Sequence, residues 1–515
     1  MDRLLKLLNP VQDASYQEDR GCMKGTRTAI LDKIITWVNL PLNPDKATTS
    51  HSDNVYWLYG MPGLGKTSVA NSLCYRLHVS GNLGGSFFCK REKESLRDPK
   101  NVLPTLISKL AAIWSPYSAL VAKALQDDPH LNPKSTNGKL LLGALWALKR
   151  PPSCTLVLVI DAFDECGDDT TRESLLESLL EACSLVNWLK VFITSRLEQD
   201  IQSFLEANEC TVQDLAEDDQ TGKDILYFAQ ERMQLVAKTR KRQQGWPGEA
   251  RLGQMTERSH GLFIYIDTIY RILKPFKDPD EKLNLVLGEQ QQDANSELHT
   301  LYLAALKSEV GEETEEFCRI ARAIIASATY RPLSDETLAS LIGKVLSVAQ
   351  SWVDALGWVF LRERSIGRGI RVRHLSILEF LTGLKDPVEL RVDLKQAHDE
   401  LSLYCLQTML KGLKFNICGL ESSYLPNGDI GNLEDRVQRN ISDALQYSCL
   451  HWANHLCANL DAPSEAVGEL LGEFFNGKWP LYWLEVLSVT GNVPAATMAL
   501  QTIIESSKVR SQFSP

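Results

Sequence analysis

The stretch Gly60-Met-Pro-Gly63-Leu-Gly65-Lys66-Thr67 has the pattern G-x-x-x-x-G-K-[ST] of a loop that binds nucleotide phosphates. Its glycines let the backbone bend closely enough for N–H groups to face phosphate oxygens. The apolar run Val55–Tyr59 precedes the loop and a helical pattern begins at Ser68, so we expect a strand, the loop and a helix in that order. This context favours a nucleotide site over a chance glycine-rich turn.

Two side chains of this loop have predicted roles. Lys66 would neutralise the β- and γ-phosphates, and the Thr67 hydroxyl would bind Mg²⁺. The positive N-terminal end of the following helix adds to the attraction for phosphate. We therefore assign the loop to nucleotide binding through the following residues: Gly60, Pro62, Gly63, Leu64, Gly65, Lys66, Thr67 and Ser68.

Length and charge limit the classes of protein that the sequence fits. A chain of 515 residues is too long for one core, so several domains are expected. It has 55 basic and 65 acidic residues, which argues against nucleic acid or an anionic membrane as the main partner. Its 12 cysteines lack C-x-x-C spacing and no secretory segment is apparent, so we expect reduced thiols and a cytoplasmic location. No apolar run approaches the roughly 20 residues that span a bilayer.

Further apolar segments predict strands at 85–90, 155–161, 190–196 and 211–215, with helical patterns at 29–38, 102–113 and 140–148. Strands that alternate with helices predict a doubly wound parallel α/β sheet. Ligands of such sheets bind at the carboxyl ends of the strands. The polar clusters at 60–67, 161–165 and 194–196 all fall at such ends, which strengthens the prediction of a nucleotide site.

The acidic run Asp161-Ala-Phe-Asp164-Glu165 predicts the rest of the chemistry. Asp161 at a strand end suits Mg²⁺ binding across from Thr67. Glu165 would orient or deprotonate the attacking water, and we place Asp164 with it as a candidate catalytic residue. Arg196 suits contact with a γ-phosphate. The alternatives are an ordinary acidic loop and a helix-capping or surface arginine.

From about Asp218 onward helical patterns dominate, apart from a strand-like alternation at 370–374 that suggests the wing of a winged helix. His374 stands before an amphipathic helix, where spacing alone favours a structural role. Cys449, His451, His455 and Cys457 look like a metal cluster. On a helix Cys449 lies nearly opposite His451, so we expect helix packing there instead of zinc binding.

Together these motifs resemble NACHT-domain proteins of the STAND class of P-loop NTPases. The resemblance is strongest to fungal members, whose N-terminal part is related to nephrocystin-3. The ordered set is more specific than the phosphate loop alone. The pieces that carry it are Cys22–Arg27, 60–67, 87–91, 97–99, 161–165, 194–196, 261–265, 298–302, 374–381, 413–424 and 450–455.

The resemblance implies an α/β NTPase followed by all-α parts: a lead at 1–20, the NACHT domain at 21–216, a small helical domain at 217–295, a winged helix at 296–388 and a C-terminal helical domain at 389–515. Such proteins close over ADP and open with ATP to oligomerise. By this likeness His374 would contact the ADP β-phosphate, Arg196 would sense the γ-phosphate, and the stretch from Cys22 to Arg27 would lie near the base.

Two positions depart from the family's pattern. Ala162 stands where many relatives have Gly, and Phe263 stands where related switches often have Pro. The second departure leaves the base open between ATP and GTP. The family's usual effector domain and sensor repeats have no room in this chain, which would be the switch module or part of a longer protein.

The leading hypothesis is therefore a nucleotide-dependent signalling switch that binds ATP/ADP with Mg²⁺, hydrolyses slowly and self-associates in self/non-self or defence signalling, with unknown effector and sensor partners. A turnover-driven remodelling ATPase would need an arginine from a neighbouring subunit, for which the sequence shows no distinctive candidate. A non-catalytic scaffold is the third hypothesis. The presence of Lys66, Thr67, Asp161 and Glu165 argues against it.

Overall fold

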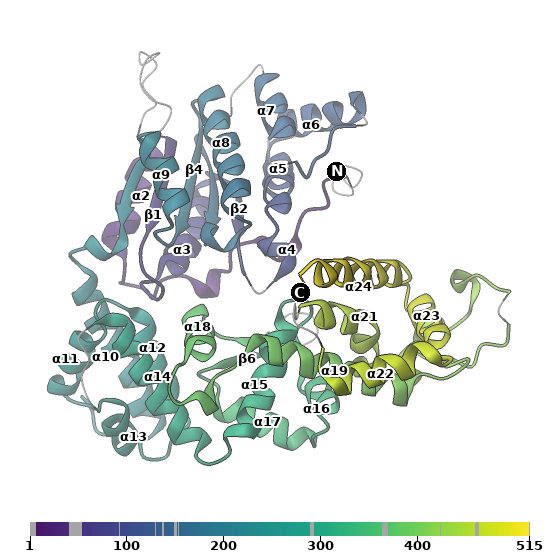
Figure 1. Ribbon diagram of the computed structural model, residues 1–515. Helices are drawn as coiled ribbons and strands as arrows, with labels where there is room; N and C mark the ends of the chain where they lie inside the picture. The colour runs from purple at the N-terminus through teal and green to yellow at the C-terminus, as the bar shows by residue number, and fades with distance from the viewer. Residues whose placement is uncertain are drawn as a thin grey trace. The chain divides into compact units, whose positions relative to one another are not determined.

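The computed structural model describes residues 7–40, 54–91, 93–128, 130–135, 138–148, 152, 154–288, 293–362, 369–422, 424–458 and 463–513 (Figure 1). Its internal contacts divide the chain into two compact units, Met1–Leu301 and Tyr302–Pro515. The finer boundaries at residues 20, 216, 295 and 388 stay predictions.

The first unit is built on a five-stranded parallel sheet, as the sequence predicts. The strand order is β2-β3-β4-β1-β5, so the chain crosses over between neighbours, as in a doubly wound sheet. The second strand begins two residues earlier than expected and ends at Phe88. The strands are β1 (Val55–Tyr59), β2 (Leu83–Phe88), β3 (Leu156–Asp161), β4 (Leu189–Ser195) and β5 (Thr211–Asp214).

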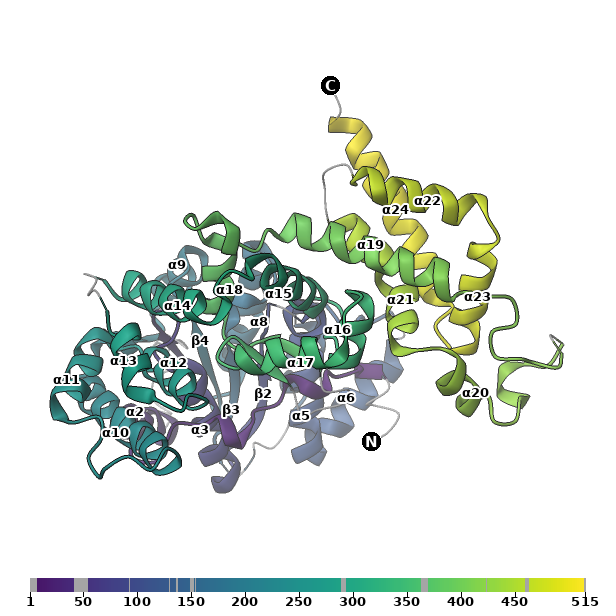
Figure 2. The same cartoon turned by 90° about the horizontal axis from the view of Figure 1, so that it is seen from below.

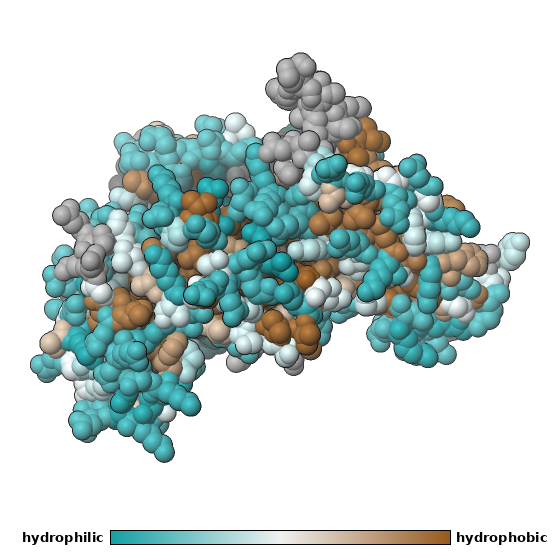
Figure 3. Space-filling view, turned by 60° about the horizontal axis from the view of Figure 1, so that its bottom comes forward, coloured by the Kyte–Doolittle hydropathy of each residue, from teal (hydrophilic) through white to brown (hydrophobic). Residues whose placement is uncertain are grey.

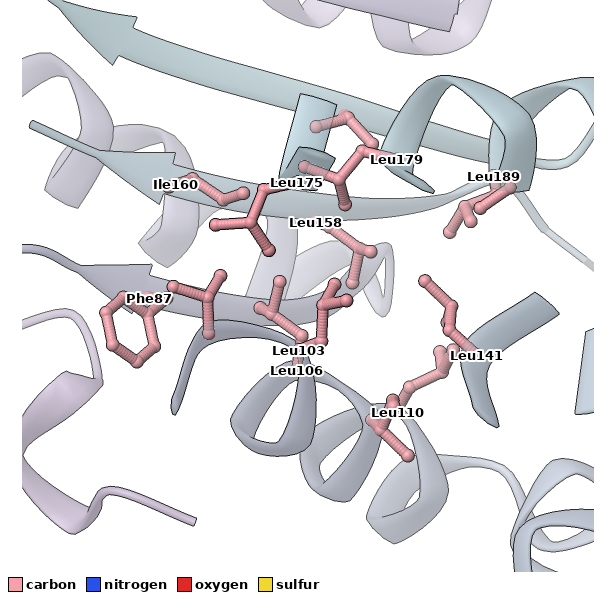
Figure 4. Close-up of a cluster of buried hydrophobic side chains, with 14 of the residues drawn as sticks. Phe87, Leu103, Leu106, Leu110, Leu141, Leu158, Ile160, Leu175, Leu179 and Leu189 are labelled. Carbon is pink, nitrogen blue, oxygen red and sulfur yellow. The ribbon is translucent and has the colours of Figure 1, made fainter. Parts of the chain in front are cut away.

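One face of this sheet packs against helices α5 (Val102–Ile113), α7 (Lys139–Trp146) and α8 (Asp169–Leu185). Figure 4 shows Leu158 and Ile160 of β3 among leucines of these helices. Every residue of β3 is buried, because both faces of a parallel sheet are covered. This two-sided burial explains why the strand is a continuous apolar run that ends in an aspartate.

The opposite face is covered by α2 (Thr28–Asn39) and α3 (Lys66–Ser80). Trp37 of α2 meets Tyr56 of β1 edge to face, with ring centroids 5.2 Å apart. Lys190 of β4 extends from the sheet and donates to the Trp37 carbonyl at 2.6 Å, which satisfies the end of α2. A buried lysine inside an apolar strand thus fixes where this helix ends.

Helices continue the first unit beyond the sheet. Arg258 and Glu297, 1% and 3% exposed, form a buried ion pair at 2.7 Å, and Tyr265 donates to the same carboxylate. This pair ties α11 and α12 to the start of α14. The remaining helices of the unit are α4 (Glu94–Arg97), α6 (Ser115–Asp127), α9 (Gln199–Ala207), α10 (Thr221–Thr239), α11 (Glu249–Arg258), α12 (Phe263–Leu273), α13 (Pro279–Val286) and α14 (Ala294–Val310), which runs into the second unit.

The second unit is mainly helical (Figure 2). The strand predicted at 370–374 is observed as β7 (Ile370–Val372), which pairs antiparallel with β6 (Phe360–Arg362). Across the described residues, no helix combines the length and the hydropathy needed to cross a membrane. The helices of the second unit after α14 are α15 (Thr314–Ala328), α16 (Asp335–Leu341), α17 (Leu346–Ala355), α18 (Leu375–Gly383), α19 (Leu394–Gly412), α20 (Leu433–Asn440), α21 (Asp443–Ala458), α22 (Glu465–Asn476), α23 (Trp479–Val489) and α24 (Pro494–Phe513).

Some apolar side chains of the described residues are exposed to solvent. In the view of Figure 3, hydrophobic residues form several separate groups within a mainly hydrophilic surface. Trp146, Phe415 and Tyr424 are the large ones with the greatest exposure among the described residues. Scattered residues of this kind are normal on a folded protein and do not identify a partner.

A partly buried histidine cluster joins α19 to α21 in the second unit. The Nδ1 atoms of His398 and His455 lie 2.9 Å apart, and Tyr447 lies 2.7 Å from His455 Nε2. His451 stacks on Tyr330. No group of His, Cys, Asp and Glu side chains among the described residues is arranged to hold a metal ion. The histidines instead pack the two helices together.

We expect this cluster to make the unit sensitive to acid. Burial lowers the pKa of His398 and His451 to about 4, helped at His451 by the charge of Arg331, and lowers that of His455 well below its ordinary value. Since the unfolded values are near 6.5, the unfolded chain takes up protons first as the pH falls. The contribution of these histidines to the free energy of unfolding is fully present above about pH 6.5. It falls toward pH 4, by about 1.4 kcal/mol per pH unit for each histidine.

Urea denaturation between pH 7 and pH 5 measures this slope. His398→Gln removes one of the titrating groups, so its stability should fall less steeply with acid than that of the wild type. His130→Gln, at an exposed position of the first unit, is the control and should keep the wild-type slope. Equal slopes for wild type and His398→Gln would contradict the prediction.

Candidate nucleotide-binding site

The phosphate loop joins the carboxyl end of β1 to the first residue of α3, Lys66. Gly60, Gly63 and Gly65 have φ values of 155°, 88° and 98°, a region that residues with a Cβ rarely adopt. Nothing lies within 4 Å of the position that a Cβ on Gly65 would take. The glycine spacing therefore gives a tight turn with open space beside its last glycine, which fits a bound phosphate.

Lys66 folds back over this loop. Its Nζ donates to the Gly60 carbonyl at 2.5 Å and to the Met61 carbonyl at 3.0 Å. Burial lowers its pKa to about 8, while the charges of Asp164 and Asp161 act in the opposite direction. The ammonium group is thus held at the helix N-terminus, beside two carboxylates.

Asp161 lies at the end of β3, close to the phosphate loop. Its Oδ1 accepts the Thr194 hydroxyl at 2.6 Å, and its side chain is also hydrogen-bonded to Thr67. Burial raises its pKa to about 6, and the two hydroxyl bonds oppose that shift. A carboxylate and a threonine hydroxyl in contact are oxygen donors of the kind that Mg²⁺ binds, so Thr67 and Asp161 fit the predicted metal role.

The acidic turn after β3 is fastened to the end of β4. Ala162 has φ of 54°, in the left-handed region that favours glycine, and its N–H donates to Thr194 Oγ1 at 3.0 Å. Asp164 Oδ1 accepts the backbone N–H of Arg196 at 3.0 Å. Glu165 Oε2 accepts the backbone N–H of Arg91 at 3.0 Å. The three predicted polar clusters therefore meet at one edge of the sheet.

Arg27 is buried beside this edge. Its guanidinium donates to Asp218 at 2.8 Å, to Thr221 at 2.6 Å and to the Leu64 carbonyl at 2.9 Å. It also stacks over Phe263 at 5.0 Å. The residue that the family resemblance places near the base thus binds the backbone of the phosphate loop and connects it to α10 and α12.

A contact that the sequence did not predict joins the loop to α12. Ile264 N–H approaches the Gly63 carbonyl at 3.3 Å, and a Cβ on Gly63 would lie 2.3 Å from Ile264 Cγ2. Gly63 is therefore required by a neighbouring helix as well as by its own backbone conformation. The sequence motif indicates only the requirement of the backbone conformation, and not the contact with the neighbouring helix.

This difference separates two glycine substitutions. Gly63→Ala should lose about 3 kcal/mol of unfolding free energy, from the left-handed backbone and from overpacking against Ile264. Gly65→Ala meets the backbone cost alone and should lose about 1–2 kcal/mol. Urea denaturation gives both values. Adding Ile264→Ala to Gly63→Ala should recover the packing part, and equal losses for the two glycines would refute the explanation.

His374 is the N-cap of α18. Its Nδ1 accepts the Ser376 N–H at 3.1 Å and lies 2.7 Å from the Ser376 hydroxyl, which in turn meets Tyr302 at 2.8 Å. This is the structural role that spacing alone favoured. The histidine belongs to the second unit and the phosphate loop to the first.

Comparison with known proteins adds one family match. Residues 43–196 match the family model described as Nephrocystin 3, N-terminal. This nephrocystin-3-like segment contains the phosphate loop and the acidic turn and ends at Arg196. Arg27, α10 and α12 lie outside it. A search of curated proteins finds no match.

Among solved structures, the chain is similar to a signal transduction ATPase with numerous domains (STAND) from Pyrococcus horikoshii that has a tetratricopeptide repeat sensor. The identity is 15% and the TM-score 0.42, over 97% of this chain and 66% of that one. It is also similar to Drosophila ORC bound to DNA, at 14% identity and a TM-score of 0.27, over 72% of this chain and 93% of that one. At these identities and TM-scores, neither similarity shows a shared function.

Proposed function

We propose that the chain is a nucleotide-dependent signalling switch that binds ATP or ADP with Mg²⁺ and hydrolyses ATP slowly. The observation that carries this proposal is the convergence of Lys66, Thr67, Asp161 and Arg196 at the carboxyl edge of the parallel sheet. The match of residues 43–196 to the nephrocystin 3 N-terminal region supports it.

Each residue has a role in this proposal. The loop N–H groups and Lys66 hold the β- and γ-phosphates, and Thr67 and Asp161 hold Mg²⁺, which when bound offsets charge on the phosphate oxygens. Arg196 contacts the γ-phosphate. Glu165 orients the attacking water. The nucleotide shifts the chain between conformations only if it binds them with different affinities.

The second unit supplies the rest of the switch in this proposal. The β6–β7 pair with α16, α17 and α18 supports a winged helix within residues 296–388. His374 would then meet the β-phosphate of ADP, and loss of that contact with ATP would allow self-association. The proposed setting is defence or self/non-self signalling in the cytoplasm, with effector and sensor partners of unknown identity.

Mass spectrometry of nucleotide released from purified protein tests the proposal. We expect ADP, with ATP binding and slow turnover on addition of Mg²⁺. Binding assays with ATP and GTP then decide the base. Turnover of many molecules per second would favour the remodelling ATPase. A protein that binds neither nucleotide would leave the non-catalytic scaffold as the remaining hypothesis.

His374→Ala tests the proposed link between the units. Loss of the histidine should weaken ADP binding and leave ATP binding close to the wild type, measured by titration calorimetry. Because His374 also caps α18, His374→Asn is the matched variant. Asn restores the cap but has no imidazole for the phosphate. If both variants bind ADP normally, the histidine is a helix cap only.

A further inference from the structure

Asp164 contacts Arg196, and its charge also acts on Lys66. Its Oδ1 accepts the Arg196 backbone N–H at 3.0 Å, and its Oδ2 lies 3.5 Å from Arg196 Nε. Its charge also acts on the buried Lys66 ammonium. The Asp164 side chain is 3% exposed and that of Arg196 is 22% exposed. A single buried carboxylate therefore contacts one of the two side chains that are proposed to meet the terminal phosphate and acts through its charge on the other.

The contact between Asp164 and the guanidinium is a loose one. Charge-assisted N–H···O bonds in proteins are typically about 2.7–2.9 Å long, shorter than the 3.5 Å found here. Asp164 Oδ2 has no hydrogen-bond partner although it is buried. A buried carboxylate oxygen is normally satisfied, so this exception requires an explanation.

The backbone around the pair is, by contrast, well fixed. Thr194 bonds to Asp161 and to Ala162, and Arg196 N–H bonds to Asp164. These bonds join the acidic turn to the end of β4, so Asp164 stays beside the first atoms of the Arg196 side chain. Arg196 Nε meets Asp164 Oδ2 at the longer separation of 3.5 Å, so an incoming phosphate can compete with this carboxylate for the guanidinium.

We propose that Asp164 is a positioning residue that competes with the γ-phosphate for Arg196 and so sets the preference of the site between ATP and ADP. This inference rests on the proposed function. ATP gains the Arg196 contact only by drawing the guanidinium away from Asp164, whereas ADP leaves the pair intact. Asp164 thereby raises the ATP concentration at which the switch responds. This role differs from the catalytic role predicted from the sequence.

Asp164→Asn tests the competition. Asn keeps an oxygen that accepts the Arg196 backbone N–H but removes the charge that holds the guanidinium. Titration calorimetry of the full chain with Mg²⁺ should show ATP binding about tenfold tighter than in wild type, and ADP binding changed by much less. In an Arg196→Gln background, Asp164→Asn should lose this effect on the ratio of the ATP and ADP Kd values.

Asp200→Asn is the matched control, because it neutralises a partly buried carboxylate that pairs with Arg172 instead of Arg196. It should leave the ATP-to-ADP Kd ratio near the wild-type value. An equal change in the control, an unchanged ratio in Asp164→Asn, or an effect that persists without Arg196 would overturn the inference while wild-type binding stands. A wild type that binds neither nucleotide would overturn the proposed function and the inference together.

Discussion

Lys66→Ala should weaken ATP binding by roughly 10- to 150-fold. The Lys66 ammonium is a strong donor to phosphate, and hydrogen bonds to charged groups contribute about 1.5–3 kcal/mol. Its place above the Gly60 and Met61 carbonyls holds the charge within the loop. Truncation to alanine also leaves Asp161 and Asp164 without that nearby cation, so the loop becomes less attractive to an anion.

Titration of a fluorescent ATP analogue in the presence of Mg²⁺ measures this loss. Lys100→Ala removes the same charge from an exposed position and should bind ATP like the wild type. Circular dichroism of Lys66→Ala confirms that the fold is kept. If Lys66→Ala binds ATP as tightly as the wild type, the loop is not the phosphate site and the proposed function fails.

Arg27→Ala should lower the free energy of unfolding by about 3–5 kcal/mol, the cost of breaking a buried ion pair by removing one partner. The side chain is 2% exposed and satisfies Asp218, Thr221 and the Leu64 carbonyl at the same time. Its loss leaves a largely buried carboxylate and a loop carbonyl without their cation. We also expect weaker nucleotide binding, because the Leu64 backbone is part of the phosphate loop.

The matched control is Arg76→Ala. Arg76 pairs with Asp32 at 2.7 Å, as short as the Arg27 contacts, but both side chains are exposed. Exposed pairs contribute about 0–1 kcal/mol, so this variant should be nearly neutral in urea denaturation. Similar losses for the two arginines would show that burial is not what gives Arg27 its effect.

The sheet and the position of its polar edge could be predicted from the sequence because the signals are local. Continuous apolar runs such as 155–161 define buried parallel strands, and glycine spacing defines the loop. The predicted metal pair follows from this, since Thr67 comes after the loop at the end of β1 and Asp161 ends β3, at the same edge of the sheet. Asp164 and Arg196 come together for the same reason.

The contacts that complete the polar edge of the sheet have no signal in the local sequence. Thr194 is one polar residue at the end of an apolar strand, and its bond to Asp161 depends on β3 and β4 being neighbours. Lys190 interrupts an apolar strand pattern, and its side chain donates to Trp37 near the end of α2, 153 residues away in sequence. Phe263, which departs from the family's pattern, lies against the guanidinium of Arg27, a contact that the sequence does not indicate; the base stays open between ATP and GTP.

The contact of Ile264 with Gly63 has a practical consequence for anyone who wishes to work with a shorter protein. A fragment that stops at residue 216 would still carry every letter of the nucleotide motif. It would nevertheless lack the helix that covers Gly63 and the side chains that hold Arg27. The nucleotide motif and the contacts that support its loop are thus encoded in different stretches of this chain.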